Sequence, residues 1–240
     1  MKTIMVTGGS GFIGSNLINL LFKKYKKIKV INIDKLTYAS NSYFVKNKDS
    51  NNYFFHKVDI CNQKKVNLLF KKYQPNIVFH LAAESHVDNS ILSPKNFLKT
   101  NIIGTYNLLN VSNEYFKKIK NKKLTNFKFI HVSTDEVFGD LNFKQMPFKE
   151  TDQYKPNSPY SASKASSDHL ARAWFKTYNL PVIISHCSNN YGPNQNSEKL
   201  IPKIIINSLK QRDIPIYSSG KQVRDWIFVD DHNEALIKLM

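Results

Sequence analysis

Short apolar runs alternate with amphipathic stretches along most of the chain. The apolar runs are rich in β-branched and aromatic residues, which is typical of buried strands, and they lie at 3–9, 29–34, 53–60, 76–83, 127–134 and 181–187. The stretches between them repeat apolar residues every three or four positions, which predicts helices at 12–25, 63–73, 97–119 and 158–178. Strands that alternate with helices pair in parallel, so we predict an α/β fold built on a doubly wound parallel sheet.

The alternation loosens from about residue 190. The segment 190–217 contains turns, one helix and a short strand, and 230–240 begins a helix without a stop signal. We therefore expect one domain over 1–188 and the start of a smaller domain over 189–240, which looks truncated.

A glycine-rich turn joins the first predicted strand to the first predicted helix. Gly8, Gly11 and Gly14 form the spacing GxxGxxG in "VTGGSGFIG". Glycine at these places allows a tight turn and a close approach of the backbone to a pyrophosphate, which the N-terminus of the helix attracts. A glycine triplet alone is weak evidence, but its strand–turn–helix context predicts a Rossmann dinucleotide-binding domain over 1–188.

An acid at the end of the second strand indicates which dinucleotide binds. Asp34 lies 20 residues beyond Gly14, where a carboxylate accepts hydrogen bonds from the ribose hydroxyls and repels a 2′-phosphate. This favours NAD over NADP, although Lys35 beside it weakens the preference. The alternative is that Asp34 is only a turn or N-cap residue.

Further cofactor contacts are predicted at the ends of the next strands. Asp59 follows the third strand at the place of the adenine, and the fourth strand ends in the small residues of "HLAA". Small side chains there let a dinucleotide lie against the backbone, although they also suit close packing. The predicted contacts from these turns are Gly8, Gly11, Phe12, Ile13, Gly14, Asp34, Lys35, Asp59, Ile60, Leu81, Ala82 and Ala83.

A tyrosine and a lysine stand one helical turn apart in "PYSASK". Tyr160 and Lys164 would therefore share one face of the helix. A nearby ammonium and the positive nicotinamide ring both favour tyrosinate, so we expect the pKa of Tyr160 to be lowered towards neutrality. Such a group is a base that removes a hydroxyl proton while a hydride leaves the same carbon. Tyr-x-x-x-Lys is frequent by chance, but with the glycine turn it predicts a dehydrogenase-type site.

Two adjacent carboxyl groups follow the fifth predicted strand in "HVSTDEVFGD". Asp135 and Glu136 leave the strand end together, where two close carboxyls tend to keep one proton between them. One acid and one base are what an elimination needs in addition to a redox base. The alternative is an ordinary acidic turn.

Charge and cysteine content argue against several other functions. The formal net charge is +17, but only Arg172, Arg212 and Arg224 are arginines, and base readout and bidentate phosphate contacts favour Arg. We therefore expect a lysine-rich solvated surface and no nucleic acid or membrane partner. Cys61 and Cys187 are isolated, without metal-ligand spacing, which predicts no metal and a reducing, cytoplasmic location.

Seven segments together resemble one known family. They are "TGGSGFIG", "HLAAESHVDNS", "STDEVFGD", "PYSASKASSDHLARAW", "CSNNYGP", "EKLIP" and "RDWIFVDDH". The chain is similar over essentially its whole length to the dTDP-glucose 4,6-dehydratases, which are extended short-chain dehydrogenase/reductases of the NAD-dependent epimerase/dehydratase family. The glycine turn and Tyr-x-x-x-Lys indicate the broad family, and "STDEVFGD" with "SASKASSDHLARAW" indicates the dehydratases.

The resemblance implies NAD-dependent conversion of dTDP-glucose to a 4-keto-6-deoxy sugar nucleotide. Tyr160, assisted by Lys164, would deprotonate the C4 hydroxyl while NAD takes the C4 hydride, and Thr134 would hydrogen-bond the C4 oxygen. Glu136 would remove the C5 proton, and Asp135 would protonate the departing C6 hydroxyl. The hydride would then return to C6.

The resemblance also implies further binding residues and a partner. A homodimer is expected through the helices at 97–118 and 159–178, and His86 and His232 are expected to be structural. Asn189 alternatively caps a turn, and Arg224 alternatively pairs with Asp225. The implied additional cofactor contacts are Thr37, Ser85, Thr100, Tyr160, Lys164 and Asn190, and the implied substrate contacts are Ser85, Thr134, Asn189, Glu198, Lys199 and Arg224.

Some positions depart from the family pattern. Phe138 stands where relatives often have Tyr, Asn89 stands where they often have Arg, and the family continues beyond residue 240 to complete a substrate domain. Three alternatives therefore stay open. They are a nucleotide-sugar epimerase or decarboxylase of the same superfamily, a truncated NAD-binding pseudoenzyme, and a lysine-driven nucleic-acid binder.

Overall fold

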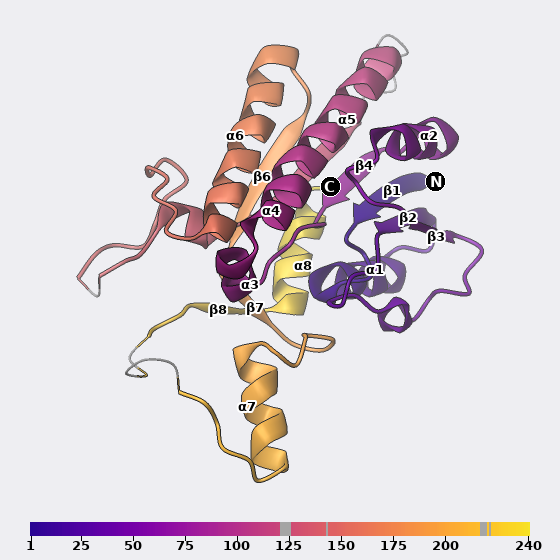
Figure 1. Ribbon diagram of the computed structural model, residues 1–240. Helices are drawn as coiled ribbons and strands as arrows, with labels where there is room; N and C mark the ends of the chain where they lie inside the picture. The colour runs from indigo at the N-terminus through magenta and orange to yellow at the C-terminus, as the bar shows by residue number, and fades with distance from the viewer. Residues whose placement is uncertain (121–125, 143, 217–219, 221) are drawn as a thin grey trace.

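Six parallel strands form the central sheet of the computed structural model, which describes residues 1–120, 126–142, 144–216, 220 and 222–240 (Figure 1). Their spatial order is β3-β2-β1-β4-β5-β6. The order reverses between β1 and β4, and sheets of this kind bind ligands beyond the carboxyl ends of their strands at that point. The predicted doubly wound α/β fold is confirmed. The strands are β1 (Lys2–Thr7), β2 (Ile28–Asp34), β3 (Tyr53–Lys57), β4 (Ile77–His80), β5 (Lys128–Thr134) and β6 (Val182–Cys187).

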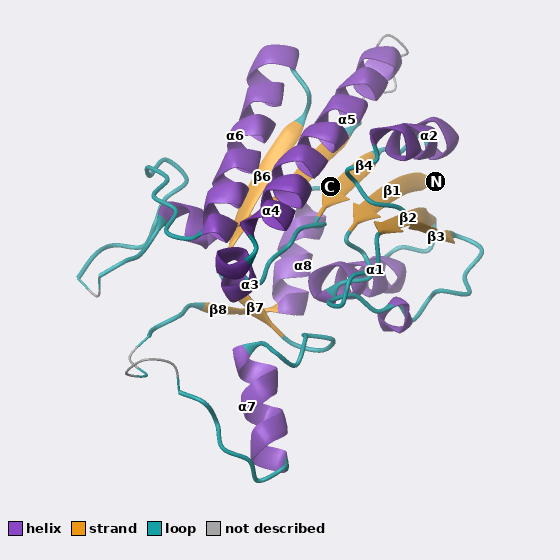
Figure 2. Cartoon of the chain, in the orientation of Figure 1, coloured by secondary structure: helices purple, strands orange, loops and turns teal. Residues whose placement is uncertain are grey.

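Helices cover both faces of this sheet (Figure 2). None of the helices that the structure describes has the length and hydropathy of a transmembrane helix. Two short 3₁₀ segments, η1 (Ser42–Phe44) and η3 (Asp135–Phe138), follow β2 and β5. The α-helices are α1 (Phe12–Lys24), α2 (Gln63–Tyr73), α3 (Val87–Leu92), α4 (Pro94–Phe97), α5 (Thr105–Lys120), α6 (Pro159–Tyr178), α7 (Leu200–Leu209) and α8 (Val229–Lys238).

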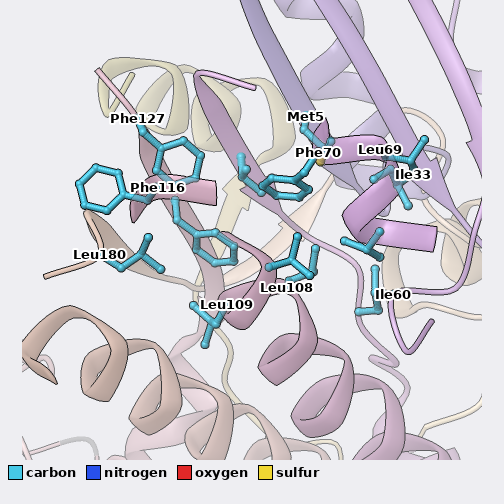
Figure 3. Packing of buried hydrophobic residues seen from close by; sticks show 14 of the residues in the cluster. Met5, Ile33, Ile60, Leu69, Phe70, Leu108, Leu109, Phe116, Phe127 and Leu180 are labelled. Atoms are coloured by element: carbon cyan, nitrogen blue, oxygen red, sulfur yellow. The ribbon is translucent and has the colours of Figure 1, made fainter. Parts of the chain in front are cut away.

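The alternation of side chains along β1 assigns the two cores to the two faces. Met5 packs into the cluster beneath α2, α5 and α6, several of whose members are labelled in Figure 3. Ile4 and Val6 point the other way, into the cluster that α1 and α8 cover. Successive strand residues face opposite sides of a sheet, so a buried strand needs apolar residues at every position. The continuous apolar runs in the sequence have this cause.

The helix predicted over 97–119 is confirmed, with one irregular stretch. The chain passes without a break from α4 through a π-helical segment, η2 (Leu98–Gly104), into α5. A Cβ added at Gly104 would lie 2.6 Å from the Cδ1 atom of Ile60, so this turn approaches the β3–α2 connection closely. Thr100 and Asn101 are buried within the segment. Inserted π turns are frequent at functional sites.

The chain after β6 forms a small two-stranded sheet and α7 outside the main sheet, and then returns to the core as α8. β7 (Asn189–Tyr191) pairs in parallel with β8 (Trp226–Phe228), and α7 lies apart from the sheet with no buried residue (Figure 1). The helix expected from 230 onwards is α8, and its Leu236 and Ile237 join the core beside α1. The segment 190–217, expected to hold turns, one helix and a short strand, contains the end of β7 and α7, and residue 217 lies outside the described residues. The two-domain division stays a prediction.

Candidate active site

The glycine turn after β1 packs directly against the end of β4. Gly8 has a φ angle of +73°, and a Cβ there would lie 2.7 Å from the backbone nitrogen of Ala82. A Cβ at Gly14 would collide with the carbonyl oxygen of Gly8. Gly11 is the N-cap of α1, and no side chain caps the first N–H groups of that helix. Uncapped N–H groups at a helix N-terminus suit a pyrophosphate.

Asp34 ends β2 beside this turn and is buried. Its Oδ2 accepts a hydrogen bond from Ser10 N (3.0 Å) and its Oδ1 accepts one from Leu36 N (2.8 Å). Burial raises the pKa of Asp34, and the two backbone donors oppose that rise. The turn role considered as an alternative is therefore present. It leaves lone pairs on both carboxylate oxygens for ribose hydroxyls.

Lys35 forms an ion pair with Glu84 and not with the neighbouring Asp34. Its Nζ lies 2.7 Å from Glu84 Oε1 and 3.2 Å from Thr100 Oγ1. Glu84 therefore offsets the positive charge that was expected to weaken the preference for NAD. Sequence reasoning missed Glu84, because the pairing joins two loops 49 positions apart in the chain.

The other predicted cofactor residues follow the carboxyl ends of neighbouring strands. Asp59 Oδ1 accepts a hydrogen bond from Cys61 N (2.8 Å) in the turn after β3. Asn190 Oδ1 lies 2.8 Å from His232 Nδ1, which orients the amide from α8. Phe12 and Ile13 open α1. Thr37 follows β2, Ile60 follows β3, and Leu81, Ala82, Ala83 and Ser85 follow β4.

These features fit a dinucleotide. The turn has no room for side chains at Gly8 and Gly14, the helix that it opens is uncapped, and a carboxylate lies at the end of β2. The first two features suit the pyrophosphate, and the carboxylate suits a ribose.

Tyr160 lies in the first turn of α6, which Ser158 and Ser161 close with a reciprocal capping box. The pKa of Tyr160 is raised above its ordinary value, mainly by burial and then by the Glu136 carboxylate, whereas the Thr134 hydroxyl lowers it. Without the cofactor, this pKa is therefore raised and not lowered as expected. The main physical reason is that burial disfavours the charged tyrosinate, and the Glu136 carboxylate adds to this effect.

Lys164 is buried one turn further along α6. Its Nζ donates a hydrogen bond to the backbone oxygen of Val132 in β5 (2.9 Å). Burial lowers the pKa of Lys164, and the negative charge of Asp168 opposes this fall. The ammonium is thus anchored to β5. The lowered pKa expected for Tyr160 depends on a second cation, the nicotinamide ring of the bound cofactor.

Thr134 organises the carboxyl pair at the end of β5. Its Oγ1 accepts a hydrogen bond from Glu136 N (3.3 Å) and lies 3.3 Å from Asp135 Oδ1. Burial raises the pKa of both Asp135 and Glu136, and the charge of Asp135 raises that of Glu136 further. A pair with raised pKa values holds a proton to higher pH than ordinary carboxyls, as an acid–base pair requires.

Residues far along the chain approach this pair. The positive charges of Arg224 and Lys199 lower the pKa of Glu136, against the effect of burial. Lys199 Nζ also donates to the backbone oxygen of Ser85 (3.4 Å). Arg224 donates to the backbone oxygen of Val223 (2.8 Å). The alternative pairing of Arg224 with Asp225 does not appear among the ion pairs of the described residues.

The remaining predicted substrate residues lie on the same side. Glu198 Oε1 is 3.7 Å from His86 Nε2. The backbone N–H of Asn189 donates to the oxygen of Asp225 (3.2 Å), which joins β7 to the residue before β8. The structure therefore brings residues 198–199 and Arg224 near the carboxyl pair. The backbone of Asn189 pairs with that of Asp225.

Sequence reasoning missed one buried carboxylate. Asp168 lies four residues after Lys164, as Lys164 lies four after Tyr160, and it is almost fully buried. Its Oδ2 is 2.7 Å from Ser133 Oγ and 3.1 Å from His186 Nε2. The repeated spacing of four was the signal that would have found it.

The fold and site define a dinucleotide-binding α/β protein of the short-chain dehydrogenase/reductase type, with a Tyr–Lys pair and a carboxyl pair at one edge of the sheet. Residues 5–240 match the profile of the family described as GDP-mannose 4,6 dehydratase. The chain belongs to this family.

Curated relatives share about half of its residues. The chain is 52% identical over 236 residues to a dTDP-glucose 4,6-dehydratase of Haemophilus influenzae, a match that covers 98% of this chain and 70% of the relative. It is 51% identical to a dTDP-glucose 4,6-dehydratase of Salmonella typhimurium, over 97% of this chain and 67% of the relative. The chain thus spans about two thirds of their length.

Solved structures agree on the fold. A dTDP-glucose 4,6-dehydratase of Bacillus anthracis, in complex with NAD, matches with a TM-score of 0.86 and 42% identity over 100% of this chain and 71% of that one. A UDP-glucose 4-epimerase of Thermotoga maritima, with UDP-glucose, matches with a TM-score of 0.88 but 31% identity, over 99% of this chain and 73% of that one. Backbone shape is common to both enzymes, whereas sequence identity is higher with the dehydratases.

Proposed function

We propose that this chain dehydrates dTDP-glucose to the 4-keto-6-deoxy sugar nucleotide with NAD as a resident cofactor. The observation that carries the proposal is the Thr134–Asp135–Glu136 turn, whose two half-buried carboxyls have raised pKa values and lie close enough to Tyr160 to raise its pKa. A dehydrogenase or an epimerase needs only the tyrosine beside the nicotinamide. A second proton-transfer pair is needed when water is eliminated.

The side chains divide the proton transfers between them. Tyr160 removes the proton of the C4 hydroxyl, and Thr134 hydrogen-bonds the C4 oxygen as its charge develops. Glu136 removes the C5 proton, which the 4-ketone has acidified, and Asp135 protonates the C6 hydroxyl so that it leaves as water. NAD, when bound, would accept the hydride from C4 and supply it again at C6, and Glu136 would return the proton to C5.

We assign the cofactor mainly to the first proposed domain and the substrate mainly to the second. The turns after β1 to β4, within 1–188, hold NAD, with Lys164, Thr100 and Asn190 completing the site. The segment 189–240 begins the substrate domain, in which Lys199 and Arg224 face the diphosphate, because cationic groups bind phosphate oxygens well. Support comes from the effect of both cations on Glu136. Ser85, Asn189 and Glu198 complete the proposed substrate set.

We further propose a homodimer. Helices α5 and α6 run side by side at one side of the molecule (Figure 1). They and η2 expose large apolar side chains, which are otherwise unfavourable in water. A second copy packed against this pair would cover Ile103, Tyr106, Phe175 and Tyr178.

Both cysteines are free, which supports the proposed cytoplasmic location.

The direct test is turnover. Purified chain is incubated with dTDP-glucose and NAD, and the alkali-induced absorbance of a 4-keto sugar is recorded over time. We expect that absorbance to appear with no net reduction of NAD. A folded, NAD-binding chain that forms dTDP-galactose instead would be an epimerase. One that binds NAD but changes no sugar would be a pseudoenzyme.

A further inference from the structure

A single buried carboxylate joins the helix of Tyr160 and Lys164 to the elements around it. Asp168 Oδ2 accepts hydrogen bonds from Ser133 Oγ in β5 (2.7 Å), Tyr154 OH in the loop before α6 (3.2 Å) and His186 Nε2 in β6 (3.1 Å). Its Oδ1 lies 3.0 Å from His131 Nε2, also in β5. One side chain of α6 therefore contacts two strands and a loop.

Three consecutive residues of β5 contact this face of α6. His131 and Ser133 contact Asp168, and the oxygen of Val132 between them accepts the Lys164 hydrogen bond. Residue 134 follows immediately and begins the Thr134–Asp135–Glu136 turn. The contacts of Asp168 and Lys164 thus set how far α6 sits along β5, and with it the distance between Tyr160 and the carboxyl pair.

Lys164 is deeply buried, where a charge is unfavourable without a counter-charge. The negative charge of Asp168 favours the charged form of Lys164. The two buried imidazoles nearby are neutral, since burial holds the pKa of His131 at about 4 and that of His80 well below its ordinary value. The titratable groups that face this pair are Tyr160 from α6, His80 from β4, His131 from β5, Cys187 and His186 from β6, Tyr154 from the loop, and Asp135 and Glu136 from η3.

We propose that Asp168, which lies one helical turn from Lys164 on the same face of α6, is a positioning residue of this site that sets the register of α6 on β5 and acts as the counter-charge of the Lys164 ammonium. It touches neither substrate nor cofactor and acts through Lys164 and Ser133. The inference rests on the proposed function for its catalytic consequence, but its electrostatic consequence is measurable on NAD binding alone.

The test compares Asp168→Asn with Tyr154→Phe. Both changes disturb the same hydrogen-bond cluster, but only the first removes the negative charge. NAD affinity is measured by calorimetry from neutral to alkaline pH on the chain without sugar. NAD affinity should fall at alkaline pH when Lys164 loses its proton, and we call this fall the alkaline limb. In Asp168→Asn we expect the alkaline limb to lie about one pH unit or more lower than in the wild type, because Lys164 then loses its proton at lower pH. Tyr154→Phe should leave that limb in place.

The register is tested separately by Ser133→Ala. This change removes the shortest bond to Asp168 and keeps its charge, so kcat for dTDP-glucose should fall about tenfold while KM and the alkaline limb stay unchanged. Asp168→Asn with an unshifted limb would overturn the electrostatic part. If Ser133→Ala kept the wild-type kcat, the proposal that Asp168 sets the position of α6 on β5 would be overturned. This test holds even if Asp168→Asn does not fold. A wild-type chain without turnover would refute the proposed function, yet the binding limb would still decide the role of Asp168.

Discussion

Lys35 Nζ lies 2.7 Å from Glu84 Oε1, so the cation beside the proposed ribose-binding position is neutralised by an acid from another loop. Glu84→Gln should release this charge and make NADP more acceptable. Because partly exposed ion pairs contribute up to about 1 kcal/mol, we expect the affinity ratio of NADP to NAD to rise about two- to fivefold. Calorimetric titration with each dinucleotide measures the ratio. Glu114→Gln, an exposed change on α5, is the matched control and should leave it unaltered.

Glu136→Gln should separate oxidation from dehydration. The amide cannot remove the C5 proton, so formation of the 4-keto-6-deoxy product should fall by about 10²–10⁴-fold, the usual contribution of a general base. Tyr160 is unchanged, so oxidation at C4 should persist and reduced nicotinamide should accumulate, which its absorbance reports. Equal loss of both signals would contradict the assigned role of Glu136.

Two glycines of the same turn should respond differently to alanine. A Cβ at Gly14 would collide with the Gly8 carbonyl, whereas the nearest atom to a Cβ at Gly11 is 3.3 Å away. Gly14→Ala should lower NAD affinity at least about tenfold, because the turn must shift from the pyrophosphate. Gly11→Ala should have the smaller effect. Similar affinities for the two variants would show that steric exclusion at Gly14 does not shape the site.

Acid should destabilise the fold before the carboxylates titrate. Burial lowers the pKa of His131 and of His232 to about 4, below the ordinary value of 6.5. Between these values the unfolded chain binds protons that the folded chain does not, so stability is retained above the unfolded pKa and is lost as pH falls towards 4. The loss amounts to roughly 3 kcal/mol for each histidine.

Urea midpoints measured between neutral pH and pH 4 check this expectation. Replacement of the exposed His169 by Gln is the matched control for this comparison. His232→Asn should reduce the slope, because one of the buried titrating groups is removed. A midpoint that does not depend on pH in this interval would exclude buried neutral imidazoles.

Two features of the structure did not follow from the sequence pattern. The spacing of apolar residues over 97–119 did not indicate the π-helical stretch, in which Gly104 lies against Ile60, a residue far away in the chain. The direction of the Tyr160 pKa depends on Glu136 and on burial, and neither follows from the spacing of Tyr160 and Lys164. Periodicity reports the faces of one element, whereas the charge environment of a side chain depends on every element packed around it.

The sequence by itself determined the alternation of strands and helices, the glycine turn and the two motifs that carry the chemistry. These are local properties, because an apolar run, a turn without side chains and a spacing of four are complete within one segment. Only the tertiary structure decided that Glu84 neutralises Lys35, that Lys199 and Arg224 approach Glu136, and that Asp168 holds α6 against β5. These pairings join distant segments, and the parallel sheet brings them together at the carboxyl ends of its strands.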